Sequence, residues 1–311
     1  MRYESPSMND REIAVAGSSG DVGRRITKAL VARGAKVRAL VRPGLAARER
    51  ETIEALGASL AVAEPSDVDA MAKACAGVTC VVSALNGLRD VIVVRQGVLL
   101  DAAVKAGVPK FIPSDYASDF TKSEPGSNRN FDLHREFFDR ANGAKISVTS
   151  ILSGAFMELL DGKMPLVQSR IHRVLYWHDA DQELDFTTKD DVASYVAAAA
   201  LDDATPRILR IAGDVVSVRD IAAAMSKVTH ERYVPMWVGT LGSLEVMIRI
   251  ARFVAPQPGT PFPPWQGMQY MRDQFSGRVK LSTLDNGRYS DIAWTSVETF
   301  LGRVFGASTK S

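Results

Sequence analysis

The chain has few of the features that mark several large classes of protein. Its 311 residues include only two cysteines, Cys75 and Cys80, which form no CxxC pair and have no zinc-ligand spacing. This argues against a disulfide scaffold and fits a reducing compartment. Lys and Arg number 38 against 36 Asp and Glu, so the chain lacks the basic field that drives nucleic-acid binding. The polar N-terminus has no hydrophobic signal region, and no apolar run approaches the length of a membrane span.

These absences predict a soluble, cytoplasmic protein whose partner is a small molecule rather than nucleic acid or a membrane. We expect it to be a monomer or a homodimer. Apolar residues make up 46% of the chain and charged residues 24%, which excludes a disordered or fibrous protein. A length of 311 residues allows one large domain or two modest ones.

The first half of the chain alternates strand-like and helix-like segments. Strands are predicted at 13–16, 36–41, 58–62, 78–83, 110–113 and 146–151. Helices are predicted at 22–33, 45–56, 66–76, 89–106 and 131–141, and glycines expected in left-handed conformation follow them at Gly34, Gly57, Gly77, Gly107 and Gly143. Ser66 begins a capping-box pattern for the third helix. Apolar strands joined by such helices predict an α/β, doubly wound parallel sheet of the Rossmann type.

The pattern changes after Ser153. Strands at 173–177 and 208–211 are predicted there, with helices capped by Thr188, by Ser217 and near Thr295, and an apolar and basic helix at 241–254. We expect residues 1–155 to form a dinucleotide-binding Rossmann core whose sheet is completed by about 172–215. Residues 156–171 and 216–311 are expected to form a smaller C-terminal lobe that binds substrate.

A glycine-rich turn between the first strand and the first helix predicts a phosphate-binding loop. Gly17 permits the tight turn, Gly20 lets the backbone approach a pyrophosphate, and Gly23 allows close helix packing. The predicted cofactor-binding residues of this loop are Gly17, Ser18, Ser19, Gly20, Asp21, Val22 and Gly23. The GxxGxxG spacing matches the short-chain dehydrogenase/reductase variant of the motif. The alternative is a glycine-rich turn that binds nothing.

Arg42 ends the second strand, where an NAD-binding protein usually has Asp or Glu. A guanidinium suits a 2′-phosphate, so NADPH is favoured over NADH. Arg48 and Arg50 follow on the next helix, where they could equally form a solvated face. Ser83 and Ala84 follow the fourth strand and are expected beside the ribose and nicotinamide, although small-residue packing would also explain them.

Motifs of several other enzyme classes do not occur in the chain. None of the seven tyrosines belongs to a Tyr-x-x-x-Lys pair, and GxSxG, HExxH, Walker lysine and DxDxDG motifs are missing. His172, His178, Asp179 and Asp181 are close in sequence but have no known metal-ligand spacing. A polar loop is therefore expected there, and no metal site.

The glycine loop, Val41-Arg42 and the segment 111–116 resemble the NmrA-like, isoflavone-reductase-like family, an atypical branch of the short-chain reductases. That family includes plant reductases of isoflavones, lignans and phenylcoumaran benzylic ethers, and regulators that bind dinucleotide without turning over substrate. The resemblance is close over about residues 11–157 and loose beyond. The reductases carry Pro-Ser-Glu-Phe-Gly after strand five, and the similar segment here runs from Pro113 to Ala117. The resemblance implies that Ser114 contacts the cofactor.

The same resemblance implies a catalytic position on the following helix. The reductases use a lysine in a Phe-Glu-x-Lys context, and the matching stretch here is Phe131-Asp132-Leu133-His134. An ungapped count from that position reaches Thr149 and Phe156, which also match the family. His134 is thus the expected proton donor or acceptor, aided by Tyr116 or Asp115. The alternatives are a cofactor contact without this chemistry and an exposed helix histidine.

The substrate side is expected to come from the C-terminal lobe. Phe156 and Met157 follow the sixth strand, and Phe262 and Trp265 follow a proline-rich stretch that could form a stiff lid. The alternative for each of them is plain hydrophobic packing.

The sequence as a whole predicts an NAD(P)H-dependent oxidoreductase. We expect an NADPH-dependent reductase of a small aromatic or cyclic carbonyl, enone or ether, with NADH the less favoured cofactor. The alternative is a non-catalytic NAD(P)-sensing regulatory protein of the NmrA type.

Overall fold

The computed structural model describes residues 11–162 and 164–306, which divide into two compact units. The first unit contains the chain up to Asp115 together with Leu133–Ile151 and Val192–Leu209. The second unit contains Tyr116–Asp132, Leu152–Asp191 and the chain from Arg210 on. The chain therefore passes between the units several times, and each unit is described by itself.

The first unit is built on a six-stranded sheet in the order β3-β2-β1-β4-β5-β6. All neighbouring strands in it are parallel. The strands are β1 Glu12–Ala16, β2 Lys36–Val41, β3 Ser59–Val62, β4 Cys80–Ser83, β5 Lys110–Ile112 and β6 Ser147–Val148. The order reverses between β1 and β4, which is the topological switch point of a doubly wound sheet. The predicted fold class is confirmed.

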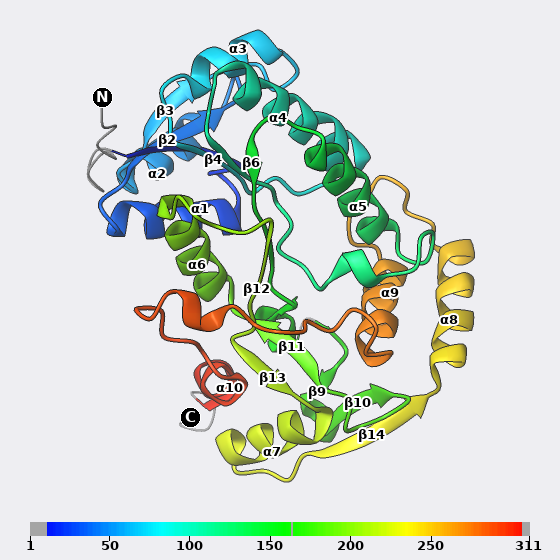
Figure 1. The fold of residues 1–311 in the computed structure, drawn as a ribbon. Coiled ribbons are helices and arrows are strands. Elements are labelled where there is room, and N and C mark those ends of the chain that lie inside the picture. Colours follow the sequence, from blue (N-terminus) through cyan, green and yellow to red (C-terminus); the bar gives the residue numbers. More distant parts are fainter. Residues whose placement is uncertain (1–10, 163, 307–311) are drawn as a thin grey trace. The chain divides into compact units, whose positions relative to one another are not determined.

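Helices cover both faces of this sheet, with α3, α4 and α5 on one side and α1 and α6 on the other (Figure 1). They are α1 Asp21–Ala32, α2 Ala47–Ala55, α3 Val68–Cys75, α4 Gln96–Lys105, α5 Arg129–Asn142 and α6 Lys189–Leu201. Because both faces are covered, the central strands are largely apolar: Ile13, Ala14 and Val15 of β1 are all fully buried. The carboxyl ends of the strands remain as the edge where ligands bind in such folds.

The structure corrects three local predictions in the first unit. The helix expected from residue 89 begins as a π-helix, Asp90–Arg95, before α4. Asp67, not Ser66, caps α3, because its carboxylate accepts the N–H groups of Asp69 and Ala70 while the Ser66 hydroxyl bonds to Glu64. Gly143 does not adopt a left-handed conformation, whereas the four glycines at positions 34, 57, 77 and 107 do.

The sixth predicted strand, 146–151, is interrupted. Thr149 N–H donates to the carbonyl of Phe111 in β5, but the next residue, Ser150, donates its N–H to the carbonyl of Arg207. The chain therefore changes partner between these two residues, and a separate strand, β7 Ser150–Leu152, begins there. A local sequence pattern contains no information about such an exchange of partners.

The second unit contains two three-stranded sheets, β14-β10-β9 and β13-β11-β8. Their strands are β8 Ala155–Phe156, β9 Val167–Gln168, β10 Arg173–Trp177, β11 Leu184–Thr187, β13 Asp214–Val216 and β14 Val234–Gly239, and β12 Ile208–Arg210 pairs with β7. Four α-helices follow in order: α7 Val218–Thr229, α8 Leu241–Val254, α9 Pro264–Phe275 and α10 Val297–Phe305. Short 3₁₀ turns occur at Phe120–Lys122, Met157–Leu160, Ser169–Ile171 and Asn286–Arg288.

Sequence patterns found β10, β12, α7, α8 and α10 but missed the other strands and α9. The missed strands other than β14 are only two to four residues long, too short for a periodic signal. Helix α9 begins at Pro264 within the stretch expected to be a lid, since proline is well tolerated in the first turn of a helix. The capping box predicted for α7 is confirmed, with Ser217 and Asp220 bonding reciprocally.

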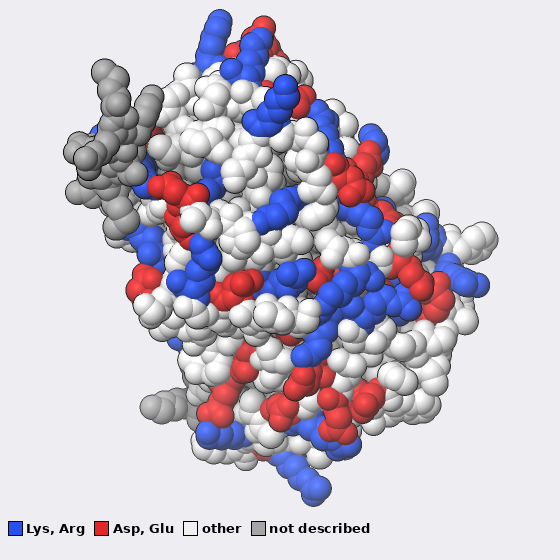
Figure 2. Space-filling model, in the orientation of Figure 1, with Lys and Arg blue, Asp and Glu red and all other residues white. Residues whose placement is uncertain are grey.

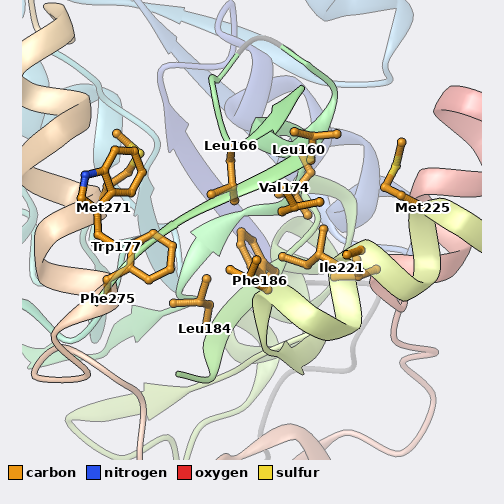
Figure 3. Packing of buried hydrophobic residues seen from close by; sticks show 14 of the residues in the cluster. Leu160, Leu166, Val174, Trp177, Leu184, Phe186, Ile221, Met225, Met271 and Phe275 are labelled. Carbon is orange, nitrogen blue, oxygen red and sulfur yellow. The ribbon is translucent and has the colours of Figure 1, made fainter. Parts of the chain in front are cut away.

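A buried cluster of aliphatic and aromatic side chains forms a core within the second unit. In it Trp177 of β10 meets Phe275 of α9 with ring centroids 5.9 Å apart, and Phe186 of β11 and Ile221 of α7 are buried in the same cluster (Figure 3). On the face shown in Figure 2, Lys and Arg side chains lie among Asp and Glu side chains, with uncharged surface between them. Within the described residues, no helix has the length and apolar character needed to cross a membrane.

Candidate functional site

The glycine loop joins β1 to α1 in a conformation that two of its glycines make possible. Gly17 has a φ of 88°, and a Cβ on it would lie 2.6 Å from the carbonyl oxygen of Ala84. A Cβ on Gly23 would lie 2.0 Å from the carbonyl oxygen of Gly17. Gly20, with a φ of −78°, needs no special backbone conformation, and a Cβ there would meet only the Gly17 carbonyl oxygen, at 3.2 Å. Gly17 and Gly23 are therefore required by the fold of the loop. Gly20 is not, so its presence is open to an explanation by a bound ligand.

Several polar side chains of the loop bond within the protein. The Ser18 hydroxyl is buried and donates to the carbonyl of Val15, and the Asp21 carboxylate pairs with Arg25 at 2.8 Å. The groups that the loop can offer an anion are therefore the backbone N–H groups of the first turn of α1, at the positive end of the helix dipole. This is the arrangement by which Rossmann folds hold a pyrophosphate.

A cavity of about 170 Å³ opens beside this loop, at the carboxyl ends of β1 and β2. Its floor and walls are mostly apolar, including Leu40, Leu45, Ala63, Pro65 and Leu85, which suits the flat face of a base. Residues Gly17 to Ser19 form one side of the cavity. The cavity therefore combines an apolar lining with the backbone of the glycine loop at one edge of the sheet.

Two arginines line the same cavity. Arg42 follows β2, as the sequence predicted, and Arg95 comes from the last residue of the π-helix. Sequence reasoning missed Arg95, although a π-helix is frequently found at functional sites. Arg50, considered from sequence, instead donates from Nε to the carbonyl of Leu45 at the start of α2. Arg95 also pairs with Asp90, with 3.7 Å between Nη2 and Oδ2. Arginine is a residue type suited to binding phosphate.

The residues expected nearer the nicotinamide lie at the same edge of the sheet. Ala84 donates its N–H to Ala16 of β1 at 2.8 Å, and its carbonyl faces Gly17. Ser83 is fully buried at the end of β4. Ser114 donates its N–H to the side chain of Gln96, a fully buried residue at the start of α4. These contacts fix the backbone after β4 against the glycine loop and the backbone after β5 against α4.

His134 and Asp115 form the polar pair of the candidate catalytic site. Asp115 follows β5 and is fully buried, and His134 lies on α5 with its side chain 14% exposed. The Nδ1 atom of His134 is 3.2 Å from Oδ1 of Asp115. A carboxylate at this position orients an imidazole ring, which is suited to exchange a proton near neutral pH.

Two further polar residues, which sequence reasoning did not single out, belong to this group. The Ser150 hydroxyl donates to Oδ2 of Asp115 at 2.6 Å, and Arg207 donates to the Ser150 hydroxyl at 2.8 Å. Tyr116, the other predicted catalytic residue, is the first residue of the second unit, with 9% of its surface exposed. The structure thus brings two of the three predicted catalytic residues together.

The four predicted substrate contacts lie in different environments of the second unit. Met157 is fully buried in its hydrophobic core, so packing accounts for it. Trp265 is 4% exposed, donates from Nε1 to Pro256, and has the guanidinium of Arg129 4.6 Å from its ring centroid. Phe156 is half-buried and Phe262 is 56% exposed. Only these last two phenylalanines present accessible aromatic surface.

Among residues 11–162 and 164–306, no group of three or more His, Cys, Asp or Glu side chains is placed to hold a metal ion. The strand order and the glycine turn define the first unit as a Rossmann-type domain with a doubly wound sheet. Comparison with known proteins makes the class more specific. The model of the NmrA-like family matches residues 9–241.

Pinoresinol reductase 1 of Arabidopsis thaliana is 27% identical over 216 residues, which cover 65% of this chain and 68% of that protein. Among solved structures, AtPrR2 with NADP+ and (+)pinoresinol superposes with a TM-score of 0.80 at 21% identity, covering 94% of this chain and 98% of the other. An isoflavone reductase superposes with a TM-score of 0.79 at 18% identity, covering 94% and 99%. The family match spans more than half of the chain, so this protein belongs to the NmrA-like family.

Proposed function

We propose that this protein is an NADPH-dependent reductase of a small phenylpropanoid-type substrate that carries a benzylic ether, carbonyl or enone. The observation that carries the proposal is the pairing of His134 with the buried carboxylate of Asp115 after β5. This pair places an oriented acid–base group at the carboxyl edge of the sheet, where the glycine loop also lies. The pinoresinol and isoflavone reductases among the similar proteins support the substrate class.

The chain's own residues would hold NADPH in three places. The first turn of α1 and the glycine loop bind the pyrophosphate, and Arg42 and Arg95 bind the 2′-phosphate of the adenosine half. Ser83, Ala84 and Ser114 form the backbone surface beside the nicotinamide. The cofactor, when bound, supplies the hydride.

His134 completes the reduction by giving a proton to the substrate oxygen. In a carbonyl or enone, the carbon atom that accepts the hydride releases π electrons toward the oxygen atom, which accepts the proton. In a benzylic ether, the C–O bond breaks as the hydride forms a C–H bond at the benzylic carbon, and the leaving oxygen accepts the proton. Asp115 keeps the imidazole oriented, so that less of its rotational freedom is lost at each turnover. Phe156 and Phe262 are the candidates for contact with an aromatic ring of the substrate.

The test is a comparison of His134 variants. The wild type is screened with furofuran lignans, isoflavones, benzylic ethers, aromatic ketones and enones in the presence of NADPH. His134→Ala should leave NADPH affinity unchanged and lower turnover roughly 10²–10⁴-fold, the usual contribution of general acid–base catalysis. Asp139→Ala, an exposed position on the same helix, is the matched control and should keep full turnover. His134→Lys restores the residue of the related reductases and should retain activity.

Two results would contradict this proposal in different ways. Full turnover in His134→Ala would exclude the histidine as the proton donor and make Tyr116 the next candidate. Tight NADPH binding with no turnover of any substrate class would exclude the reductase and favour the NAD(P)-sensing regulatory protein.

A further inference from the structure

A continuous chain of polar side chains runs through the first unit from His134 to Arg207. His134 Nδ1 lies 3.2 Å from Oδ1 of Asp115, and Oδ2 of the same carboxylate accepts the Ser150 hydroxyl at 2.6 Å. Nη1 of Arg207 donates to that hydroxyl oxygen at 2.8 Å. The four residues come from α5, the end of β5, β7 and the segment before β12. Only the fold brings them together.

Arg207 is held against the helix that carries His134. Its Nε donates to Oδ1 of Asn142 at 2.8 Å, and its guanidinium lies 3.8 Å from the ring centroid of Phe138. Phe138 lies four residues after His134 on α5, so the two side chains occupy neighbouring positions on one face of the helix. The Ser150 N–H donates to the carbonyl of Arg207, which fixes the segment from the other side. These contacts fix the position of the guanidinium through several independent bonds.

The network gives the buried carboxylate its counter-charge. Asp115 is fully buried, and a buried ionised carboxylate is strongly disfavoured unless it is paired and hydrogen-bonded. Burial lowers the pKa of Arg207, and the charge of Asp115 opposes that shift. The two charges therefore stabilise each other across the Ser150 hydroxyl.

The order of the residues excludes a serine nucleophile. In a Ser-His-Asp triad the histidine lies between the serine and the carboxylate and removes the serine proton. Here the carboxylate lies in the middle, and Ser150 donates its proton to Asp115 rather than to His134. Of the two residues bonded to the carboxylate, we therefore consider the histidine, whose side chain is 14% exposed, for proton exchange.

We propose that Asp115, Ser150 and Arg207 are positioning residues that hold His134 in the tautomer with the proton on Nδ1, so that Nε2 exchanges the proton with substrate. This inference rests on the proposed reductase function for its role in the reaction, but not for its geometry. In the reductive direction, Nε2–H gives its proton to the substrate oxygen and the ring becomes neutral with Nδ1–H still bonded to Asp115. Solvent water then returns a proton to Nε2.

The tautomer can be measured without any substrate or cofactor. The full chain is labelled with ¹⁵N-histidine, and the ring nitrogens of His134 are assigned by their loss in His134→Gln. At a pH where the ring is neutral, we expect an Nδ1–H signal in the wild type. Ser150→Ala and Arg207→Met should each raise the share of Nε2–H, and Asp115→Ala should make Nε2–H the larger population. Arg207→Lys keeps the charge and should restore part of the Nδ1–H share.

Matched controls show whether the effect belongs to the network. Ser147→Ala changes an exposed serine of β6, and Arg89→Met removes an arginine that pairs with Glu136 on the surface of α5. Neither should change the tautomer. Either of two results would overturn the proposal, whether or not the protein is a reductase. One is that His134 of the wild type carries its proton mainly on Nε2. The other is that Ser150→Ala and Arg207→Met have the same tautomer ratio as the wild type.

Turnover gives the second measurement once a substrate is found. Asp115→Asn keeps the shape of the carboxylate but loses its charge, and it should lower kcat roughly 10²-fold or more with NADPH affinity unchanged. Ser150→Ala should lower kcat about tenfold, and the substrate KM should change little. Unchanged kcat in both variants would contradict a positioning role in catalysis. If the NMR experiment gives the expected tautomers but no substrate is turned over, the proposed function is contradicted and the positioning of His134 is not.

Discussion

The carbonyl oxygen of Gly17 lies 2.0 Å from the position that a Cβ on Gly23 would occupy. The first turn of α1 therefore packs directly against the end of β1, and no side chain fits between them. This close approach sets the direction in which the N–H groups of the helix point toward the edge of the sheet. It makes Gly23 a structural requirement of the loop, independent of any ligand.

Replacing Gly23 should therefore destabilise the protein even without a ligand. In Gly23→Ala the new methyl group overlaps a backbone oxygen, so the helix or the loop must shift. We expect a loss of about 1–3 kcal/mol in the free energy of unfolding, typical of overpacking. Urea unfolding of the ligand-free protein measures this loss. Gly267→Ala is the control, because a Cβ on Gly267 would meet nothing within 4 Å. Gly44→Ala is unsuitable, because Gly44 has a φ of 76°. An unchanged free energy of unfolding would contradict the close packing.

Gly20 should behave differently from Gly23. Its backbone is extended, and a Cβ would meet only the Gly17 carbonyl oxygen at 3.2 Å, which a small movement relieves. Gly20→Val should thus destabilise the ligand-free protein less than Gly23→Ala does. The branched side chain should nevertheless abolish NADPH binding, because it occupies the approach to the pyrophosphate. Calorimetric titration tests this, and normal binding by Gly20→Val would mean that the loop is only a turn.

The two arginines of the cavity should determine the choice of cofactor. We expect NADPH to bind at least tenfold more tightly than NADH, a difference of about 1.4 kcal/mol in binding free energy. Arg42→Ala should remove most of this preference and Arg95→Met part of it, because both residues line the cavity. Arg48→Ala is the control on the neighbouring helix. Equal affinity of the wild type for the two cofactors would refute the assignment of the 2′-phosphate site.

The two cysteines should be unreactive in the native protein. Both are fully buried, and burial raises the pKa of the Cys75 thiol to about 11 and that of Cys80 to about 12. Neither thiol should react with a disulfide reagent at pH 8, whereas both should react after unfolding in urea. Rapid modification of either thiol in the native protein would contradict their burial.

The same raised pKa values make stability fall in alkaline solution. The folded state keeps its thiol protons to higher pH than the unfolded state, whose thiols ionise near the ordinary value of 9.0. The stabilisation is therefore complete below about pH 9 and is lost as pH rises toward 11 and 12. The free energy of unfolding should decrease over this window in the wild type. The decrease should be smaller when both cysteines are replaced by alanine.

Local signals account for most of what the sequence predicted. Apolar strands, helices of sufficient length and glycines at the helix ends are properties of short stretches of chain. They determined the doubly wound sheet and placed Gly17, Gly23 and Arg42 at its edge. The helix α8 was predicted with its observed bounds, because its ends are marked by local chemistry. The family also followed from short motifs, and the match over residues 9–241 confirms it.

Relationships between distant segments could not be read in the same way. The exchange of partner at Ser150, the contribution of Arg95 to the cavity and the helix α9 in a proline-rich stretch all depend on what lies beside each segment in space. The predicted substrate contacts show the same limit. Met157 and Phe262 are both large apolar residues, but Met157 is buried in a core and Phe262 is exposed.

The sequence by itself determined the Rossmann sheet, its glycine loop and the position of a histidine on the helix after β5, since each depends on periodicity and spacing along the chain. Only the tertiary structure decided which carboxylate that histidine meets and what neutralises it. Asp115, Ser150 and Arg207 lie far apart in the chain, and the burial of Asp115 arises only when the sheet and α5 pack together. A buried charged group is strongly disfavoured unless it is paired and hydrogen-bonded, and burial is a property of the folded chain.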